Sequence, residues 1–248
     1  MDRIIYTAMN GAQQLLQQQS AVANNLANVN TTGFREQLAI QRAVPLQGGA
    51  LFPTRVSTVE VTPGTSHKEG PLAETGNPLD VAIAGKGWFA VQTPGGEAYT
   101  RAGDFSINAD NVLVTKQGYP VMSAEGGPIE LPDRGVVTFS TDGQISALGA
   151  GDNPRDIQNV GQLRLVNPDE NTLQRGDDGW FRLEEGAVAQ PDPTIQIAPG
   201  FVEKSNVNAA EAMVAMINNS RHFEMQMKVI TDASSREEKA NSILATNS

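Results

Sequence analysis

The fold is decided by two stretches, IIYTAMNGAQQLLQQQSAVANNLA at residues 4–27 and MVAMINNSRHFEMQMKVI at residues 213–230. In both, mostly apolar or small residues recur at alternating steps of three and four, which places them along one side of a helix. The stripe residues are Ile5, Ala8, Ala12, Leu15, Gln19, Val22 and Leu26 in the first stretch, and Met213, Met216, Ser220, Phe223, Met227 and Ile230 in the second. We therefore predict a long helix near each end of the chain, each with a narrow face suited to a partner helix.

The chain between these helices has a different character. All 14 prolines lie between Pro45 and Pro199. From Asp80 to Ile197, short apolar runs alternate with turn signals such as Asp142-Gly143, a spacing typical of a sandwich-like or barrel-like β domain. We predict an α+β fold, with long N- and C-terminal helices paired as a coiled-coil-like α domain and a central all-β domain of short strands.

Three parts follow from this division. We expect a discontinuous helical assembly domain, an irregular linker and a β-rich domain, at residues 1–34 plus 205–248, 35–76 and 77–204, respectively. Asn208 and Glu211 form a capping-box pattern at the start of the second helix, and no Gly or Pro follows them. The second helix is therefore predicted to run for about 35–38 residues, far beyond the average of about 11–12.

In an alternative interpretation, the two helices form a local hairpin that folds back on the β domain and has no role in assembly. Polar Gln19 and Ser220 and small Ala8 and Ala12 lie in the stripes, which weakens an isolated pair but permits close packing against several neighbours. We favour an assembly subunit on this ground.

The composition excludes several classes of function. The net charge is −10, and almost all of it falls on residues 35–204. That distribution argues against a nucleic-acid partner or an anionic membrane surface, both of which need clustered Lys and Arg. The absence of cysteine excludes disulfides and thiolate metal sites.

No part of the sequence predicts direct membrane insertion, because no stretch approaches the roughly 18 apolar residues of a membrane span. The first 20 residues lack the basic start and apolar run of a cleaved secretory signal. We expect the protein to stay in the cytoplasm or to leave it by another route.

Catalytic patterns are missing from the sequence. His67 and His222 are expected to be surface residues, and Gly85-Lys86-Gly87 lacks the spacing of a phosphate-binding loop. Trp88 and Trp180 are expected in the core rather than in a binding site. We therefore predict no enzymatic activity, no metal, no cofactor and no small-molecule substrate.

Residues 23–35, ANNLANVNTTGFR, resemble the N-terminal signature of flagellar rod and hook proteins. The asparagines are expected to bond backbone groups where the helix ends, Gly33 to adopt a positive φ, and Phe34 to anchor the emerging chain to the helix. The signature residues are Asn24, Asn25, Leu26, Asn28, Thr32, Gly33, Phe34 and Arg35.

Two further regions carry the same resemblance. Residues 77–105, with Thr100, Arg101 and Gly103, resemble the shared β-domain motif of this family, and residues 200–208, with Ser205 and Asn206, resemble its lead-in to the C-terminal helix. The chain departs from the pattern at Asn111, where the family usually has Gly. Because Asn adopts the left-handed conformation comparatively readily, we expect this turn to be kept.

The chain is thus identified as a member of the flagellar rod and hook axial protein family, most similar to its proximal-rod members. The resemblance implies a structural subunit of the basal-body rod, the drive shaft that transmits torque across the periplasm and encloses the export channel. It implies helical assembly with further copies and with other proximal- and distal-rod proteins. It also implies export by the flagellar type III apparatus without signal cleavage.

The resemblance also gives expectations for single residues. The assembly contacts, which can equally serve the intrachain helix pair, are predicted at Ile5, Leu15, Val22, Leu26, Met213, Met216, Phe223, Met227 and Ile230. Residues expected to be read during export are Ile4, Ile5, Phe34 and Leu38.

A distal-rod or hook subunit is an alternative function for the whole chain. A β-domain enzyme or carbohydrate binder with helical dimerisation ends is another, and it requires a concave site with convergent carboxylates or exposed aromatics.

Overall fold

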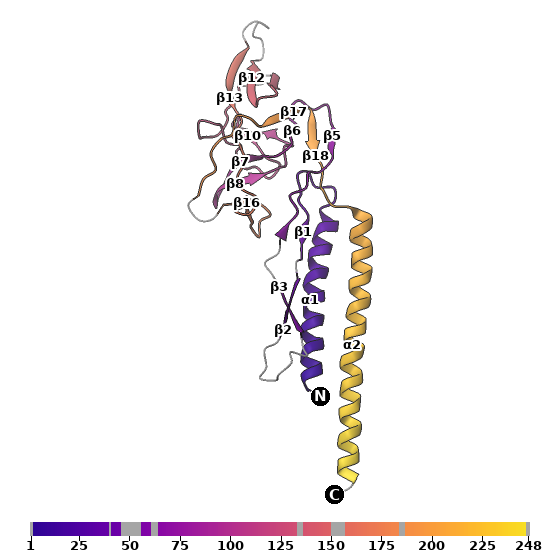
Figure 1. The fold of residues 1–248 in the computed structure, drawn as a ribbon. Helices are drawn as coiled ribbons and strands as arrows, with labels where there is room; N and C mark the ends of the chain where they lie inside the picture. Colours follow the sequence, from indigo (N-terminus) through magenta and orange to yellow (C-terminus); the bar gives the residue numbers. More distant parts are fainter. Residues whose placement is uncertain are drawn as a thin grey trace. The chain divides into compact units, whose positions relative to one another are not determined.

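The computed structural model describes residues 2–39, 41–45, 56–60, 64–132, 136–149, 157–183 and 187–246. The chain divides into two compact units (Figure 1). The helical unit comprises Met1–Val29, Glu36–Ser66 and Val207–Ser248, and the β unit comprises Asn30–Arg35 and His67–Asn206. Two terminal helices and a central β-rich region confirm the predicted α+β class.

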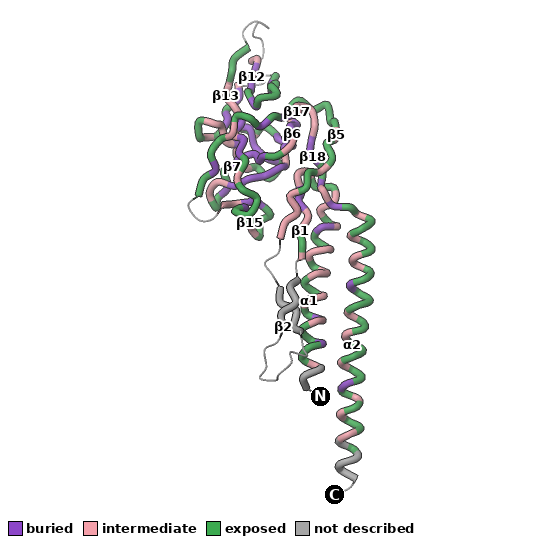
Figure 2. The backbone as a smooth tube through the Cα atoms, viewed as in Figure 1, coloured by how far each residue is buried: buried purple, intermediate pink, exposed green. Residues whose placement is uncertain are grey.

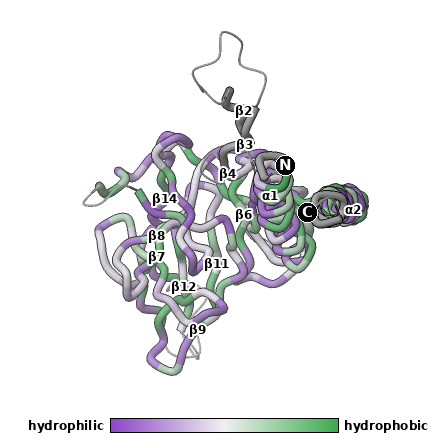
Figure 3. The backbone as a smooth tube through the Cα atoms, turned by 90° about the horizontal axis from the view of Figure 1, so that it is seen from below, coloured by the Kyte–Doolittle hydropathy of each residue, from purple (hydrophilic) through white to green (hydrophobic). Residues whose placement is uncertain are grey.

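The helical unit is built on α1 (Asp2–Ala27) and α2 (Ala209–Thr246), which lie side by side in both views (Figures 1 and 3). Strands β2 (Gln41–Pro45) and β3 (Val56–Glu60) form an antiparallel ladder, and β3 lies along α1. Short strands β1 (Gln37–Leu38) and β4 (Gly64–Thr65) form a second antiparallel pair.

These strands lie in the stretch that we expected to be an irregular linker, residues 35–76. Several of its described segments pair in ladders, and residues 40, 46–55 and 61–63 of the predicted linker lie outside the described residues. These strands are hard to predict from the sequence, because Gly48-Gly49, Pro53 and Pro63-Gly64 interrupt the alternation that normally identifies a strand. The predicted helical part also extended to residue 34, whereas Asn30–Arg35 belong to the β unit.

The start of α2 follows the predicted capping box. Asn208 Oδ1 accepts hydrogen bonds from the backbone N–H of Ala210 and Glu211 at 3.0 and 3.5 Å, and Asn208 Nδ2 donates to Glu211 Oε1 at 3.1 Å. The helix spans 38 residues, the upper limit of the expected length. Neither described helix combines the length and apolar character that a membrane span requires.

The β unit contains a five-stranded antiparallel sheet in the order β14-β7-β8-β16-β15 and a three-stranded antiparallel sheet in the order β11-β12-β13. The strands of the first sheet are β14 (Leu165–Val166), β7 (Trp88–Thr93), β8 (Gly96–Thr100), β16 (Phe181–Arg182) and β15 (Gln174–Arg175). Those of the second are β11 (Val136–Phe139), β12 (Gln144–Leu148) and β13 (Gln158–Gln162).

Three further antiparallel pairs complete the unit. They are β6 (Val81–Ala84) with β17 (Gln196–Pro199), β5 (Leu72–Glu74) with β18 (Phe201–Glu203), and β9 (Ser106–Ile107) with β10 (Leu113–Val114). Before β10, Asn111 has a φ of 59°, so this residue keeps the left-handed turn as predicted.

Two apolar clusters fill the β unit, which appears as the main purple region in Figure 2. The larger cluster includes Phe89, Leu113, Ile145 and Trp180, and the smaller one includes Trp88. Burial of one large apolar side chain stabilises a fold by about 1.5–3 kcal/mol. The predicted core roles of both tryptophans are confirmed, since they are 5% and 9% exposed.

Candidate assembly interface

Burial on α1 follows the predicted stripe. Ala8 and Ala12 are buried, and the half-buried stripe residues are Ile5, Leu15, Gln19, Val22 and Leu26. Large apolar side chains also project from outside the stripe, since Tyr6, Met9 and Leu16 are 66%, 52% and 55% exposed. One side of α1 is therefore covered within the chain, while another side presents apolar surface to solvent.

On α2, part of the covered stripe lies one position before the predicted stripe. Met216, Phe223 and Ile230 are half-buried as expected for a covered face, but Met213, Ser220 and Met227 are exposed. The covered positions instead belong to the residues that directly precede these three, Ala212, Asn219 and Gln226. Ala233, beyond Ile230, is also buried. Since α1 is the main element that packs on α2, these residues mark the side of α2 that faces α1.

Small and polar residues occupy buried positions where the two helices meet. A Cβ atom added to Gly11 of α1 would lie 3.3 Å from Gln226 Nε2 of α2. Ala12 is 7% exposed and Asn219 is also 7% exposed, so residues without large apolar side chains occupy buried positions on both helices. A prediction based on hydrophobicity chose the methionines, whereas small and polar residues occupy several of the covered positions.

The asparagines at the end of α1 bond to the backbone as predicted. Buried Asn25 pairs with the backbone of Gln37, donating from Nδ2 to the carbonyl at 2.9 Å and accepting from the N–H at Oδ1 at 2.8 Å. Asn28 Nδ2 donates to the carbonyl of Asn24 at 3.0 Å. These bonds tie the last turn of α1 to β1, and Leu38 of that strand is 38% exposed.

The signature continues into a buried group of charges within the β unit, here named the Glu203 cluster and formed by Arg35, Arg101 and Glu203. Glu203 Oε1 lies 3.0 Å from Arg35 Nη2, and Glu203 Oε2 lies 2.8 Å from Arg101 Nε. Each of the three side chains is only 2–3% exposed. Burial lowers the pKa of both arginines, and Glu203 opposes this effect, so the two cations depend on one carboxylate.

Backbone bonds surround the cluster. Arg101 donates from Nη1 to the carbonyl of Gly87 at 2.8 Å and from Nη2 to that of Gly85 at 2.6 Å. The N–H of Gly70 donates to Glu203 Oε1 at 2.8 Å, and that of Gly33 donates to the carbonyl of Glu203 at 2.8 Å. Residues from four distant parts of the sequence thus meet at one carboxylate.

The glycines of the signature are required by close backbone contacts. Gly33 has a φ of 66°, as predicted, and a Cβ there would lie 2.2 Å from the backbone nitrogen of Ala102. A Cβ on Gly103 would lie 1.7 Å from the carbonyl oxygen of Val81. No other residue fits at either position without movement of the backbone.

The polar signature residues bond within the β unit. Thr32 Oγ1 donates to Asp104 Oδ2 at 2.7 Å, and Thr100 Oγ1 accepts from the N–H of Ala102 at 3.0 Å. Asn206 Nδ2 donates to the carbonyl of Lys68 at 2.9 Å, and Ser205 is buried.

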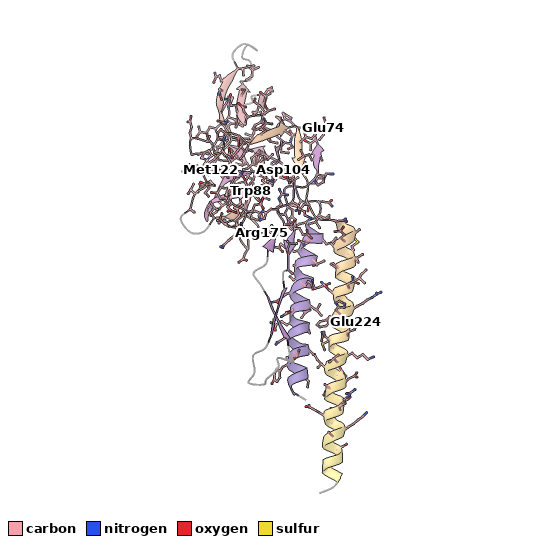
Figure 4. All side chains as sticks on the ribbon, viewed as in Figure 1. Glu74, Trp88, Asp104, Met122, Arg175 and Glu224 are labelled. Atoms are coloured by element: carbon pink, nitrogen blue, oxygen red, sulfur yellow. The ribbon has the colours of Figure 1, made fainter. Side chains whose placement is uncertain are left out.

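Phe34 has a partner that sequence reasoning did not supply. Its ring is 7% exposed and lies 4.5 Å from the guanidinium carbon of Arg175, within the β unit. Arg175 also donates from Nη1 to the carbonyl of Arg35 at 2.9 Å, and Figure 4 labels it near this part of the unit. Nothing in the sequence around Arg175 indicated this contact, because it joins residues about 140 positions apart.

The two histidines differ from each other. His222 is exposed, as expected for a surface residue, but His67 is half-buried with its ring centroid 6.2 Å from that of Trp88. The surface prediction was wrong for His67, because its neighbours in sequence are polar while its neighbours in space are aromatic. Ile4 lies in α1, and its side chain is outside the described residues.

Comparisons with known proteins bear on the whole chain. Residues 5–35 match a family described as "Flagella basal body rod protein", residues 82–147 the "Flagellar hook protein FlgE/F/G D1 domain", and residues 198–243 the "Flagellar basal body rod FlgEFG protein C-terminal". The chain is 48% identical to the flagellar basal-body rod protein FlgF of Salmonella typhimurium, over 99% of each chain. The chain belongs to the FlgF family of flagellar basal-body rod proteins.

Other relatives agree with this placement. The FlgF protein of Escherichia coli is 46% identical over 99% of each chain, and the FlgG protein of Bacillus subtilis is 31% identical over 93% of this chain. The predicted resemblance to flagellar rod proteins, with its proximal-rod preference, is thereby confirmed. FlgF-family membership also favours a structural rod subunit over an enzyme or a carbohydrate binder.

Proposed function

We propose that this chain is a subunit of the proximal rod of the flagellar basal body and that it assembles helically through α1 and α2. The two helices act as a coiled-coil-like pair, and neighbouring subunits pack against the apolar residues that this pair leaves exposed. The assembled rod transmits torque as a drive shaft and encloses the export channel. Its partners are further copies of this chain and other proximal- and distal-rod proteins.

The observation that carries this proposal is the one-sided packing of the helices. On α1 the exposed apolar residues are Tyr6, Met9 and Leu16, and on α2 they are Met213, Val214, Ile217, Met225, Met227 and Val229. Exposed apolar surface gathered along two long helices is typical of a protein–protein contact. The names of the relatives, all rod proteins, indicate which contact this is.

Several further features follow from the same proposal. The chain reaches the periplasm-spanning rod through the flagellar type III export apparatus, without a cleaved signal peptide, and has no catalytic activity. Ile4, Ile5, Phe34 and Leu38 remain proposed export contacts. Because Phe34 is 7% exposed in the folded β unit, its recognition requires an unfolded chain during export.

Two substitutions on α2 test the proposal in a motility assay with complemented cells. Met227→Asp alters a residue that is 43% exposed, so the monomer should keep its helix pair while rod assembly and swimming are lost. Phe223→Asp, on the covered face, should impair both the helix pair and assembly. His222→Asp, at an exposed polar neighbour, is the matched control and should swim normally.

Rods recovered from the same cells show where assembly stops. Normal motility in both Met227→Asp and Phe223→Asp cells would contradict an assembly role for α2. Loss of motility with complete rods would place the defect after assembly and would count against the proposed contacts.

A further inference from the structure

A cavity of about 360 Å³ lies within the β unit next to the Glu203 cluster. Its lining comes from five stretches of sequence, namely Arg35, His67–Glu69, Lys86–Trp88, Arg101, and Asn167 with Glu170. Trp88, labelled in Figure 4, provides an aromatic wall, and the guanidinium carbon of Arg35 lies 5.9 Å from its ring. The cavity therefore combines an apolar wall with several cationic groups.

The charges of the lining are unbalanced. The lining contains four cationic side chains and only two acidic ones. The cationic ones are Arg35, Lys68, Lys86 and Arg101, and the acidic ones are Glu69 and Glu170. Glu203, behind the lining, neutralises one further positive charge through its two ion pairs. An excess of one positive charge thus remains at this cavity, in a chain whose net charge is −10.

Two hydrogen-bonding groups of the lining have no partner among the described residues. Arg35 Nε and His67 Nδ1 are inaccessible to solvent and make no hydrogen bond there, although Arg35 as a whole is 97% buried. A buried donor without a partner costs about 1–3 kcal/mol, and a ligand that accepts its hydrogen recovers that cost. Burial also lowers the pKa of His67, which favours the neutral ring, and a neutral ring can carry a hydrogen on Nδ1.

We propose that this cavity is a binding site for a single carboxylate group carried on a short aliphatic chain. One negative charge balances the excess of the lining, whereas a doubly charged phosphate would exceed it. The carboxylate oxygens accept hydrogen bonds from Arg35 and His67, and the attached methylene groups lie against Trp88. Lys86 is 74% exposed and paired with Glu170 at 3.2 Å, and it turns from Glu170 to the incoming anion.

Two sources supply such a group, a free carboxylic acid or an acidic side chain of a neighbouring subunit. The proposal does not depend on the proposed function, and only the second source rests on it. The first probe is therefore butyrate, which presents one carboxylate on a short aliphatic chain as the glutamate side chain does, with butyramide as its uncharged counterpart.

Titration of the ¹⁵N-labelled full chain gives the direct test. Butyrate should shift the signals of Gly87, the Trp88 indole and the His67 ring saturably, with a Kd in the range of about 1–10 mM. Butyramide should leave them in place. Lys86→Gln should weaken binding by about threefold, and Lys116→Gln, another exposed lysine paired with a carboxylate in this unit, should have no effect.

The outcomes separate clearly. Equal shifts with both probes, no saturation, equal affinities in the two lysine variants, or tighter binding of inorganic phosphate would each overturn the proposal. Carbodiimide coupling in isolated basal bodies then identifies the source. A link from Lys68 or Lys86 to an acidic residue of another subunit indicates a neighbouring side chain, while binding of the probe without such a link indicates a free carboxylate.

Discussion

The two units of this chain are held together by different means. The β unit buries large apolar side chains and a cluster of charges, and its signature glycines fit where no Cβ can. The helical unit has few fully buried residues, and its helices appear mostly pink and green in Figure 2. The β unit therefore buries its large apolar side chains within itself, whereas the helical unit leaves apolar surface along both helices.

This difference suggests a division of roles. Small and polar residues such as Ala12, Asn219 and Gln226 on the covered faces give a close but weak helix pair. Most helical stability in proteins comes from packing of an apolar face, and here part of the apolar surface of both helices is left exposed by the described residues. Neighbouring subunits in a rod would supply the missing contacts. The following substitutions are chosen to break or sharpen this contrast, and they run from the largest expected effect to the smallest.

Glu203→Gln should have the largest effect. It leaves Arg35 and Arg101 buried without their counter-charge, which costs about 3–5 kcal/mol in the free energy of unfolding. Both tryptophans of the chain lie in the β unit, so their fluorescence during urea unfolding reports on that unit alone. Exposed Glu125→Gln is the control and should stay within about 0.5 kcal/mol of the original chain. A small effect of Glu203→Gln would mean that the cluster does not hold the β unit.

Gly33→Ala should follow, with a loss of about 3 kcal/mol from the left-handed φ and the contact with Ala102 combined. Gly76→Ala is a matched control, because Gly76 has a φ of 71° and nothing lies within 4 Å of its added Cβ. That control should lose only about 1 kcal/mol. The difference between the two variants, measured by the same fluorescence, gives the contribution of the close approach, and equal losses would argue against it.

Asn25→Ala moves the comparison to the helical unit. It removes two hydrogen bonds to Gln37 and should lower the stability of this unit by about 1–2 kcal/mol, with little change in the β unit. Circular dichroism at 222 nm follows the helices while tryptophan fluorescence follows the β unit. Exposed Asn24→Ala is the control. A parallel shift of both signals would show that the two units unfold together.

Gly11→Ala should have the smallest effect and the opposite sign. Alanine favours a helix over glycine by about 0.5–1 kcal/mol, and the new methyl group meets only the flexible end of Gln226. We expect a modest gain in the melting temperature of the helical signal. A clear loss would indicate that α1 and α2 pack more tightly than their exposed surfaces suggest.

The sequence predicted the features that depend on local spacing. The two helices, the capping box at Asn208, and the left-handed residues Gly33 and Asn111 all follow from short patterns. The face of α2 that is covered within the chain lies about one position away from the predicted stripe, because the 3-4 spacing allows two neighbouring stripes and hydrophobicity favours the one with methionines. The sequence alone therefore does not show which methionines of α2 pack against α1 and which remain exposed.

The features that the sequence did not predict depend on contacts between distant residues. Arg35 and Arg101 were recognised as signature residues, but Glu203, which joins them, was not recognised as their partner. The contact of Arg175 with Phe34 and the cavity beside His67 are of the same kind. A buried ion pair has no local spacing, so only the fold reveals it.

The Glu203 cluster has a mechanical consequence. Residues 33–35 follow the end of α1 in sequence, and residues 203–206 precede α2. The two segments are joined by the Arg35–Glu203 ion pair, the bond from the N–H of Gly33 to the carbonyl of Glu203, and the bond from the N–H of Asn206 to the carbonyl of Phe34. A pull that slides one segment past the other loads these bonds at the same time, so they must rupture together rather than one after another. Such an arrangement resists shear far better than the same bonds opened in series, as a shaft under alternating load requires.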